Sequence, residues 1–180
     1  VLVWLGSGKQ EKLLALALGL FLISIDTGGI QIFSFAALAI LYTTYVLIMN
    51  QPLNGPILGG IFTIFGFGIF GKHIRNVLPI LVGTLIAYFL NIYDPHSVSA
   101  TVTILFATNL APVAGEYGFI AGIFAGFCHV SIVSSVGVLH GGLNLYNNGF
   151  SGGFVAATLV PIFESIRNSR FFDKKEEEYL

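Results

Sequence analysis

Charged residues are almost missing from the long central part of this chain. Between Leu13 and Phe163 the charged side chains are those of Asp26, Lys72, Arg75, Asp94 and Glu116. The whole chain is 55% hydrophobic and 9% charged, whereas an ordinary soluble domain has about 25% charged residues. Because so few charged side chains cannot cover a water-facing surface, the composition predicts an integral membrane protein.

The apolar runs predict helices of two kinds. A membrane-spanning helix needs about 20 apolar residues, and the runs 30–49 and 117–139 reach that length. The shorter runs are either spans extended by polar residues or half-helices that enter and leave on one side; they cover 13–25, 57–71, 77–92, 98–111 and 152–166. We therefore expect an all-α, polytopic helix bundle with five to seven embedded segments, at least one of them re-entrant or broken.

The remaining charges gather at the two ends and suggest how the chain is divided. We expect an N-terminal cytoplasmic or interfacial lead over 1–12, a transmembrane helical domain over 13–166 and a charged C-terminal tail over 167–180. Lysine and arginine mark the cytoplasmic side of membrane proteins, and they occur in both end segments, so both termini are expected in the cytoplasm. Because Val1 to Leu5 resemble the end of an apolar segment, we also expect earlier helices of a longer chain to precede them.

One polar stretch lies between two apolar segments. Residues 139–150 read LHGGLNLYNNGF. Polar side chains at membrane depth must be buried in protein or line a wet cavity. Carboxamides both donate and accept hydrogen bonds, so they can replace the hydration of a solute. We expect a solute-binding site here, formed by His140, Asn144, Asn147 and Asn148; the alternative is a simple connecting turn at 147–149.

Two further segments share the pattern N-x-x-P. They are Asn76 to Pro79 and Asn109 to Pro112. Proline is well tolerated in the first turn of a helix, and a preceding asparagine can cap the free amide groups. Two helix starts that face each other inside a membrane would offer N–H donors to a solute, so Asn76 and Asn109 are candidate binding residues. The alternative is a pair of ordinary caps at the membrane interface.

The few central charges have both a functional and an ordinary interpretation. Lys72 and Arg75 either lie in a cytoplasmic loop, with their ammonium and guanidinium groups reaching the headgroups, or turn inward and bind an anionic solute. An embedded cation would need an acid nearby, for which Asp26 and Glu116 are the candidates. Asp26 can also cap the next helix, bind a cation or exchange a proton.

Glycines recur at four-residue spacing in the run that begins at Tyr117. Gly118, Gly122 and Gly126 fall near one stripe of a helix, with Ala121 and Ala125 beside them. Such a stripe lets another backbone approach closely. The spacing predicts tight helix packing, with a partner helix either in the same chain or in a second copy.

Several classes of function are disfavoured. The chain has no basic patch with interleaved aromatic residues, so no nucleic acid partner is expected. It contains neither an HExxH motif nor a nucleotide-binding loop, and we predict neither an enzyme nor a resident cofactor or metal. His129 and His140 are eleven residues apart, about three helical turns, which leaves a haem- or metal-holding role as an alternative.

Three of these segments also carry a resemblance. GKHIRNVLP at 71–79, TNLAP at 108–112 and LHGGLNLYNNGF at 139–150 resemble motifs of a family of bacterial polytopic membrane proteins of unknown function, common in Firmicutes. The resemblance covers roughly residues 13–166 and corresponds to the later part of longer family members. It implies a multi-pass protein of the bacterial cytoplasmic membrane, and it names no substrate.

Together these patterns favour a membrane channel or secondary transporter for a small polar or anionic solute. The expected partners are the lipid bilayer and that solute, with a second copy of the chain or a missing N-terminal part as further candidates. The alternative function is a structural or cofactor-holding membrane subunit of a larger complex.

Overall fold

The structure is a computed structural model that describes residues 30–68, 71–90, 94, 96–140 and 144–178. The regular structure of these residues is helical, which confirms the prediction of an all-α chain. In chain order the helices are α3 (Ile30–Ile48), α4 (Gly55–Gly68), α5 (Ile74–Leu90), α6 (Val98–Ala107), η1 (Thr108–Leu110), α7 (Ala111–Tyr117), α8 (Phe119–Val133), η2 (Gly137–His140) and α9 (Asn144–Glu178).

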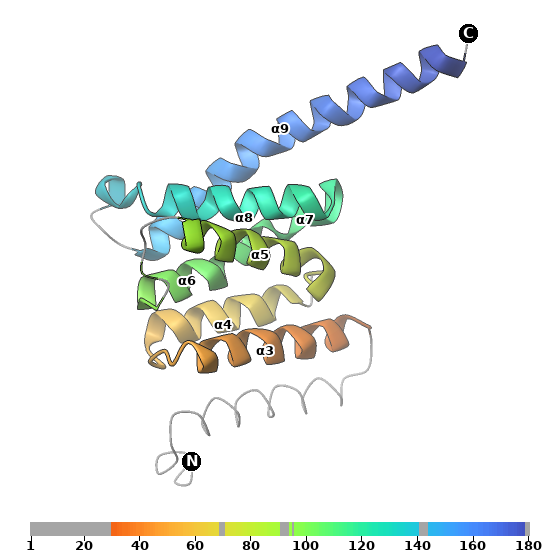
Figure 1. Cartoon of the computed structure of the whole chain (residues 1–180). Coiled ribbons are helices and arrows are strands. Elements are labelled where there is room, and N and C mark those ends of the chain that lie inside the picture. Colours follow the sequence, from red (N-terminus) through yellow and green to blue (C-terminus); the bar gives the residue numbers. More distant parts are fainter. Residues whose placement is uncertain (1–29, 69–70, 91–93, 95, 141–143, 179–180) are drawn as a thin grey trace.

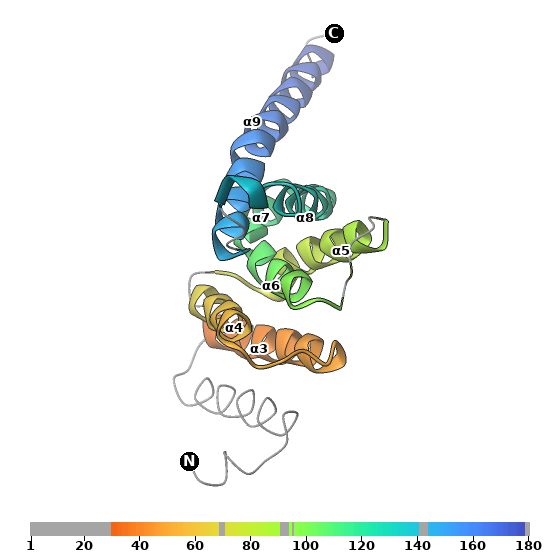
Figure 2. The ribbon, with the colours of Figure 1, turned by 90° about the vertical axis from the view of Figure 1, so that its left-hand side faces the viewer.

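The helices stack in successive layers. Helices α3 and α4 lie side by side, α5 and α6 form the next layer, and α7 and α8 follow (Figures 1 and 2). Helix α9 begins against α6 and α8, and its C-terminal half then leaves the bundle (Figure 1). The most extensive contact between two helices joins α5 to α8.

Two apolar cores hold the layers together. The first lies among α3, α4, α5 and α6 and includes Leu38, Ile61 and Leu105. The second lies among α5, α6, α7, α8 and α9 and includes Ile80, Ala125 and Val155. Helices α5 and α6 contribute to both cores and so connect the two halves of the described bundle.

The run 117–139, expected to be one spanning helix, forms α8 over Phe119–Val133 and η2 over Gly137–His140. Gly118 has φ +91° and lies between α7 and α8. Residues with side chains rarely adopt this backbone conformation, and it cannot continue a right-handed helix. Gly118 therefore ends α7 instead of contributing to a packing stripe, which corrects its predicted role.

The other two glycines of the predicted stripe pack as expected. A Cβ atom built on Gly122 would lie 2.6 Å from Cβ of Ala114 and 2.8 Å from Cβ of Pro79. One built on Gly126 would collide with the backbone carbonyl of Ile80. The two glycines thus let α8 approach α5 closely, and the partner helix belongs to the same chain.

The lengths of the helices can be compared with the predicted number of membrane crossings. Two helical stretches are long and apolar enough to cross a membrane: Val98–Tyr117, which α6, η1 and α7 form together, and Tyr146–Ser169 within α9. The apolar helices Ala36–Ile48, Gly55–Gly68, Ile74–Leu90 and Phe119–Val133 are shorter. Five to seven embedded segments therefore remain a prediction.

Helix α9 is longer than the run 152–166 predicted. It begins at Asn144 and continues through Glu178, so Asn147, Asn148 and Gly149 are helical. The alternative that these residues form a connecting turn is therefore wrong. Asn148 and Ser151 are fully buried, and Ser151 donates a hydrogen bond to the backbone carbonyl of His129 on α8, so contact with α8 stabilises the helix over this polar stretch.

Candidate functional site

Lys72 lies in the connection between α4 and α5 and is buried, with 7% of its surface exposed. Its ammonium nitrogen Nζ donates a hydrogen bond to Oγ1 of Thr108, at 2.8 Å. The same nitrogen lies 5.1 Å from the centre of the Phe67 ring, a favourable cation–π distance. Lys72 therefore turns into the protein, as the functional interpretation of this segment required.

Arg75 does not follow Lys72 inward. Its side chain is exposed in the first turn of α5. The two cations of the GKHIRN segment thus have different environments, and Lys72 alone of the two is buried.

No carboxylate pairs with Lys72 within the described part of the chain. Glu116, a predicted partner, instead forms an ion pair with Arg167, with 2.5 Å between the guanidinium nitrogen and the carboxylate oxygen, so the pairing predicted for Glu116 is wrong. The other predicted partner, Asp26, lies outside the described residues. Burial lowers the pKa of Lys72 from 10.5 to about 8, because the charged ammonium loses hydration.

A cavity of about 350 Å³ opens beside Lys72. We call it the Lys72 cavity. Its walls come from the end of α4, the start of α5, η1 and the start of α7: Phe67, Gly71, Lys72, Asn76, Asn109, Ala111 and Pro112. The fold therefore brings together three residues that the sequence nominated separately, namely Lys72, Asn76 and Asn109.

Asn76 caps α5 from within its first turn. The helix begins at Ile74, two residues before Asn76, so Pro79 lies inside the helix and not at its start. Oδ1 of Asn76 accepts a hydrogen bond from the backbone N–H of His73 at 2.9 Å, and Nδ2 donates one to the carbonyl of Gly71 at 3.1 Å. The prediction that Asn76 precedes the helix is wrong by three residues, because this side chain reaches backward as the third helical residue of a capping box does.

Asn109 occupies η1, just before α7. Pro112 lies in the first turn of α7, as predicted, but no side chain caps this helix. The Asn109 side chain is exposed and makes no hydrogen bond to the described residues. A Cβ atom built on Gly152 would lie 2.8 Å from Cγ of Asn109, so the missing side chain at Gly152 leaves room for the carboxamide.

A second cavity, also about 350 Å³, lies at the far ends of α5 and α6. We call it the Asn147 cavity. Oxygen-bearing side chains dominate its lining, including those of Tyr88, Asp94, Ser99, Thr103, Ser134 and Asn147. The Lys72 cavity uses the start of α5 and the residues after α6, whereas the Asn147 cavity uses the end of α5 and the start of α6. The two cavities therefore lie at opposite ends of these helices.

Among the described side chains of the 139–150 stretch, that of Asn147 lines this cavity. Asn148 points to α8, where its Oδ1 lies 3.2 Å from Nε2 of the buried His129. This pair joins α8 to α9 and lines neither described cavity. His140 ends η2 and Asn144 begins α9, but their side chains lie outside the described part of the structure.

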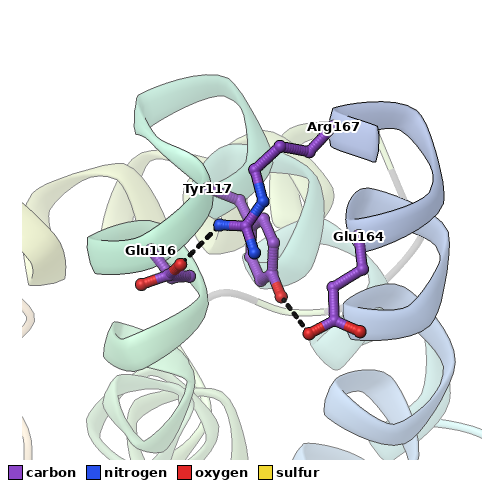
Figure 3. Close-up of polar contacts among 4 residues, drawn as sticks. All are labelled: Glu116, Tyr117, Glu164 and Arg167. Atoms are coloured by element: carbon purple, nitrogen blue, oxygen red, sulfur yellow. Dashed lines mark hydrogen bonds and ion pairs between the residues drawn. The ribbon is translucent and has the colours of Figure 1, made fainter. Parts of the chain in front are cut away.

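A polar cluster joins α7 to α9 (Figure 3). The Arg167 guanidinium pairs with Glu116 and lies 5.5 Å from the centre of the Tyr117 ring, and the Tyr117 hydroxyl donates to Glu164 at 3.3 Å. All four residues come from the end of α7 or from α9, at the level where α9 leaves the bundle (Figures 1 and 3). The cluster thus fixes the exit of α9.

Two residues around the Lys72 ammonium were not predicted as site residues from the sequence. They are Thr108, which accepts the Lys72 hydrogen bond, and Phe67, whose ring lies beside the ammonium. Hydroxyl groups alternate at positions 97, 99, 101 and 103, and this pattern is visible in the sequence. Two of those residues, Ser99 and Thr103, line the Asn147 cavity.

Comparison with known proteins identifies a family but no function. No curated protein and no solved structure matches this chain. The family model described as Protein of unknown function (DUF1576) matches residues 21–165, which include all helices from α3 to α8 and both cavities. The chain therefore belongs to this family of unknown function, DUF1576.

Proposed function

We propose that this chain is a membrane protein that transports a small anionic solute, and that the Lys72 cavity binds the solute. The observation that carries the proposal is the buried ammonium of Lys72, which has no carboxylate partner among the described residues and borders a cavity. A buried charge without a counter-charge is costly. A bound anion would supply the missing charge.

Exposed apolar side chains support a membrane location. Phe89 on α5 is 84% exposed and Ile120 on α8 is 82% exposed, and other large apolar side chains are exposed on α3, α4 and α9. Soluble monomers rarely expose extensive apolar surface, whereas lipid-facing helices must. Lysines and arginines near both ends favour a cytoplasmic location for both termini.

The two cavities support transport in preference to binding alone. Asn76 and Tyr88 mark the two cavities along α5 and are twelve residues apart, about 18 Å along a helix. Between the cavities, α6 carries Ile104, Leu105 and Ala107, all buried. A solute that moves between the cavities would have to pass these buried side chains, as in a secondary transporter or a gated channel and not in an open pore.

Uptake by proteoliposomes that contain the full chain tests the proposal. The solutes are chloride, phosphate, sulfate, acetate and butyrate, each offered separately. We expect uptake of at least one of these anions, and its loss in Lys72→Gln. Arg75→Gln is the matched control, because it removes an exposed cation three residues away that does not line the cavity. The proposal fails if no anion enters, or if Lys72→Gln and Arg75→Gln transport equally well.

A further inference from the structure

The walls of the Lys72 cavity combine polar and apolar groups. The lining includes the ammonium of Lys72 and the carboxamides of Asn76 and Asn109 together with the Phe67 ring, Ala111 and Pro112. Ligand cavities that combine a few polar groups with apolar walls select solutes that have both kinds of surface. An inorganic anion would leave the apolar walls without a partner.

The charge of the cavity sets the charge of its solute. Lys72 is the one charged side chain among the described residues of the lining. A dianion such as sulfate would bring a second negative charge that this cavity does not neutralise, and burying an unpaired charge is costly. The balance therefore favours a single negative charge.

The hydrogen-bond donors suit a planar anionic group. The ammonium of Lys72 has three N–H donors, of which one is used by Thr108. Asn109 has a carboxamide that makes no hydrogen bond to the described residues. Lys72 comes from the α4–α5 connection and Asn109 from η1, so the cavity has donors from two segments of the chain, one for each oxygen of a carboxylate.

We infer that the solute of the Lys72 cavity is a small monocarboxylate with a short hydrocarbon group, whose carboxylate meets Lys72 and Asn109 while its hydrocarbon part lies against Phe67 and Pro112. This inference rests on the proposed function and specifies its solute. It also predicts how affinity depends on chain length. Each buried methylene of the ligand strengthens binding about fourfold, until the hydrocarbon group fills the cavity of about 350 Å³.

Calorimetric titration of the full chain in nanodiscs tests this inference. The ligands are acetate, butyrate, hexanoate and octanoate, with chloride and sulfate as anions that lack a hydrocarbon group, and empty nanodiscs correct for partition into lipid. We expect affinity to rise along the first members of the carboxylate series and then to stop rising, and both inorganic anions to bind more weakly than butyrate.

Two phenylalanines of α4 provide a matched pair of variants. Phe67 and Phe62 are each 53% exposed, but only Phe67 lines the cavity among the described residues. Phe67→Ala should lower the affinity for butyrate at least fourfold and the affinity for acetate less. Phe62→Ala should leave the affinities of the whole series unchanged.

The outcomes separate this inference from the proposed function. Binding of chloride or sulfate at least as tight as butyrate, with uptake that depends on Lys72, would overturn the monocarboxylate assignment and leave anion transport intact. Affinity that keeps rising through octanoate would also overturn the monocarboxylate assignment. The hydrocarbon tail of the ligand would then lie in lipid, and the ligand would be lipid-like. Absence of binding by any anion would remove both proposals.

Discussion

The ammonium nitrogen of Lys72 lies 2.8 Å from the hydroxyl oxygen of Thr108, a residue 36 positions further along the chain. This hydrogen bond joins the connection before α5 to η1, the short turn between α6 and α7. Both are points where helices are interrupted. The bond therefore links two connections between helices, and residues of both connections line the Lys72 cavity.

Anion binding should weaken as pH rises through about 8. Burial lowers the pKa of Lys72 to about 8, and only the protonated ammonium attracts an anion. Well above that pH, affinity should fall about tenfold for each pH unit. Because a bound anion favours the charged form, it raises the pKa of Lys72, so binding near pH 8.5 should take up protons. Calorimetry in buffers of different ionisation enthalpy measures this uptake, and an affinity that is constant from pH 7 to pH 9.5 would contradict the prediction.

Thr108→Val should move this pH dependence to lower pH. The substitution keeps the shape of the side chain but removes the oxygen that accepts the Lys72 hydrogen bond. With one acceptor fewer, the charged ammonium is less stable and the pKa of Lys72 falls further. The measurement is the pH at which anion affinity is halved. Thr101→Val is the control, because Thr101 is equally buried on α6 but does not accept the Lys72 hydrogen bond; equal shifts in both variants would argue against a specific role for Thr108.

Gly126→Ala should destabilise the packing of α5 against α8. The added Cβ atom would collide with the backbone carbonyl of Ile80, which cannot move without shifting α5. Overpacking of this kind costs about 1–3 kcal/mol in free energy of unfolding. Gly149→Ala is the control, since its Cβ atom would meet nothing within 4 Å and alanine favours a helix by about 0.5–1 kcal/mol. Thermal unfolding in detergent compares the two, and a Gly126 variant as stable as the Gly149 variant would be inconsistent with the close approach.

Asn148→Leu should destabilise the chain by leaving a buried imidazole without its partner. His129 and Asn148 are both fully buried, with 3.2 Å between Nε2 and Oδ1. An unsatisfied buried polar group costs about 1–3 kcal/mol, whereas replacement of both partners costs less than the two single changes together. A double-mutant cycle with His129→Leu measures the difference from unfolding free energies. Additive effects would mean that the two side chains do not interact.

Gly152→Ala should weaken anion binding through Asn109. The new Cβ atom would lie 2.8 Å from Cγ of Asn109 and shift its carboxamide, which lines the Lys72 cavity. The neighbouring Gly153 provides the control, because a Cβ atom there would have open space around it. We expect a several-fold loss of affinity in Gly152→Ala alone, measured by the same titration. A loss of the same size in Gly153→Ala would point to α9 as a whole and not to Asn109.

The amino-acid sequence predicted the helical class and most helix positions, because long apolar runs between polar breaks leave few alternatives. It could not decide between Lys72 and Arg75. The decision depends on where α5 begins and on Thr108, 36 residues away. A local pattern does not contain a contact over that separation.

The glycine and asparagine clusters illustrate the same limit. Gly118, Gly122 and Gly126 share one spacing, but a positive φ at Gly118 breaks the helix before the stripe begins. Asn147 and Asn148 are neighbours, yet successive residues of a helix point about 100° apart. One therefore borders a cavity and the other binds His129. From the sequence alone, the three glycines look equivalent, and so do the two asparagines. The backbone conformation that gives them different roles is set by packing between helices.

The buried side chains of Ile104, Leu105 and Ala107 have a consequence for the cell that makes this protein. They lie on α6 between the two cavities. If the chain carries anions, its resting form does not leak, and the cell keeps its ion gradients and membrane voltage however many copies it holds. Transport would then require these buried side chains to move, so its rate would follow a helix movement and not diffusion.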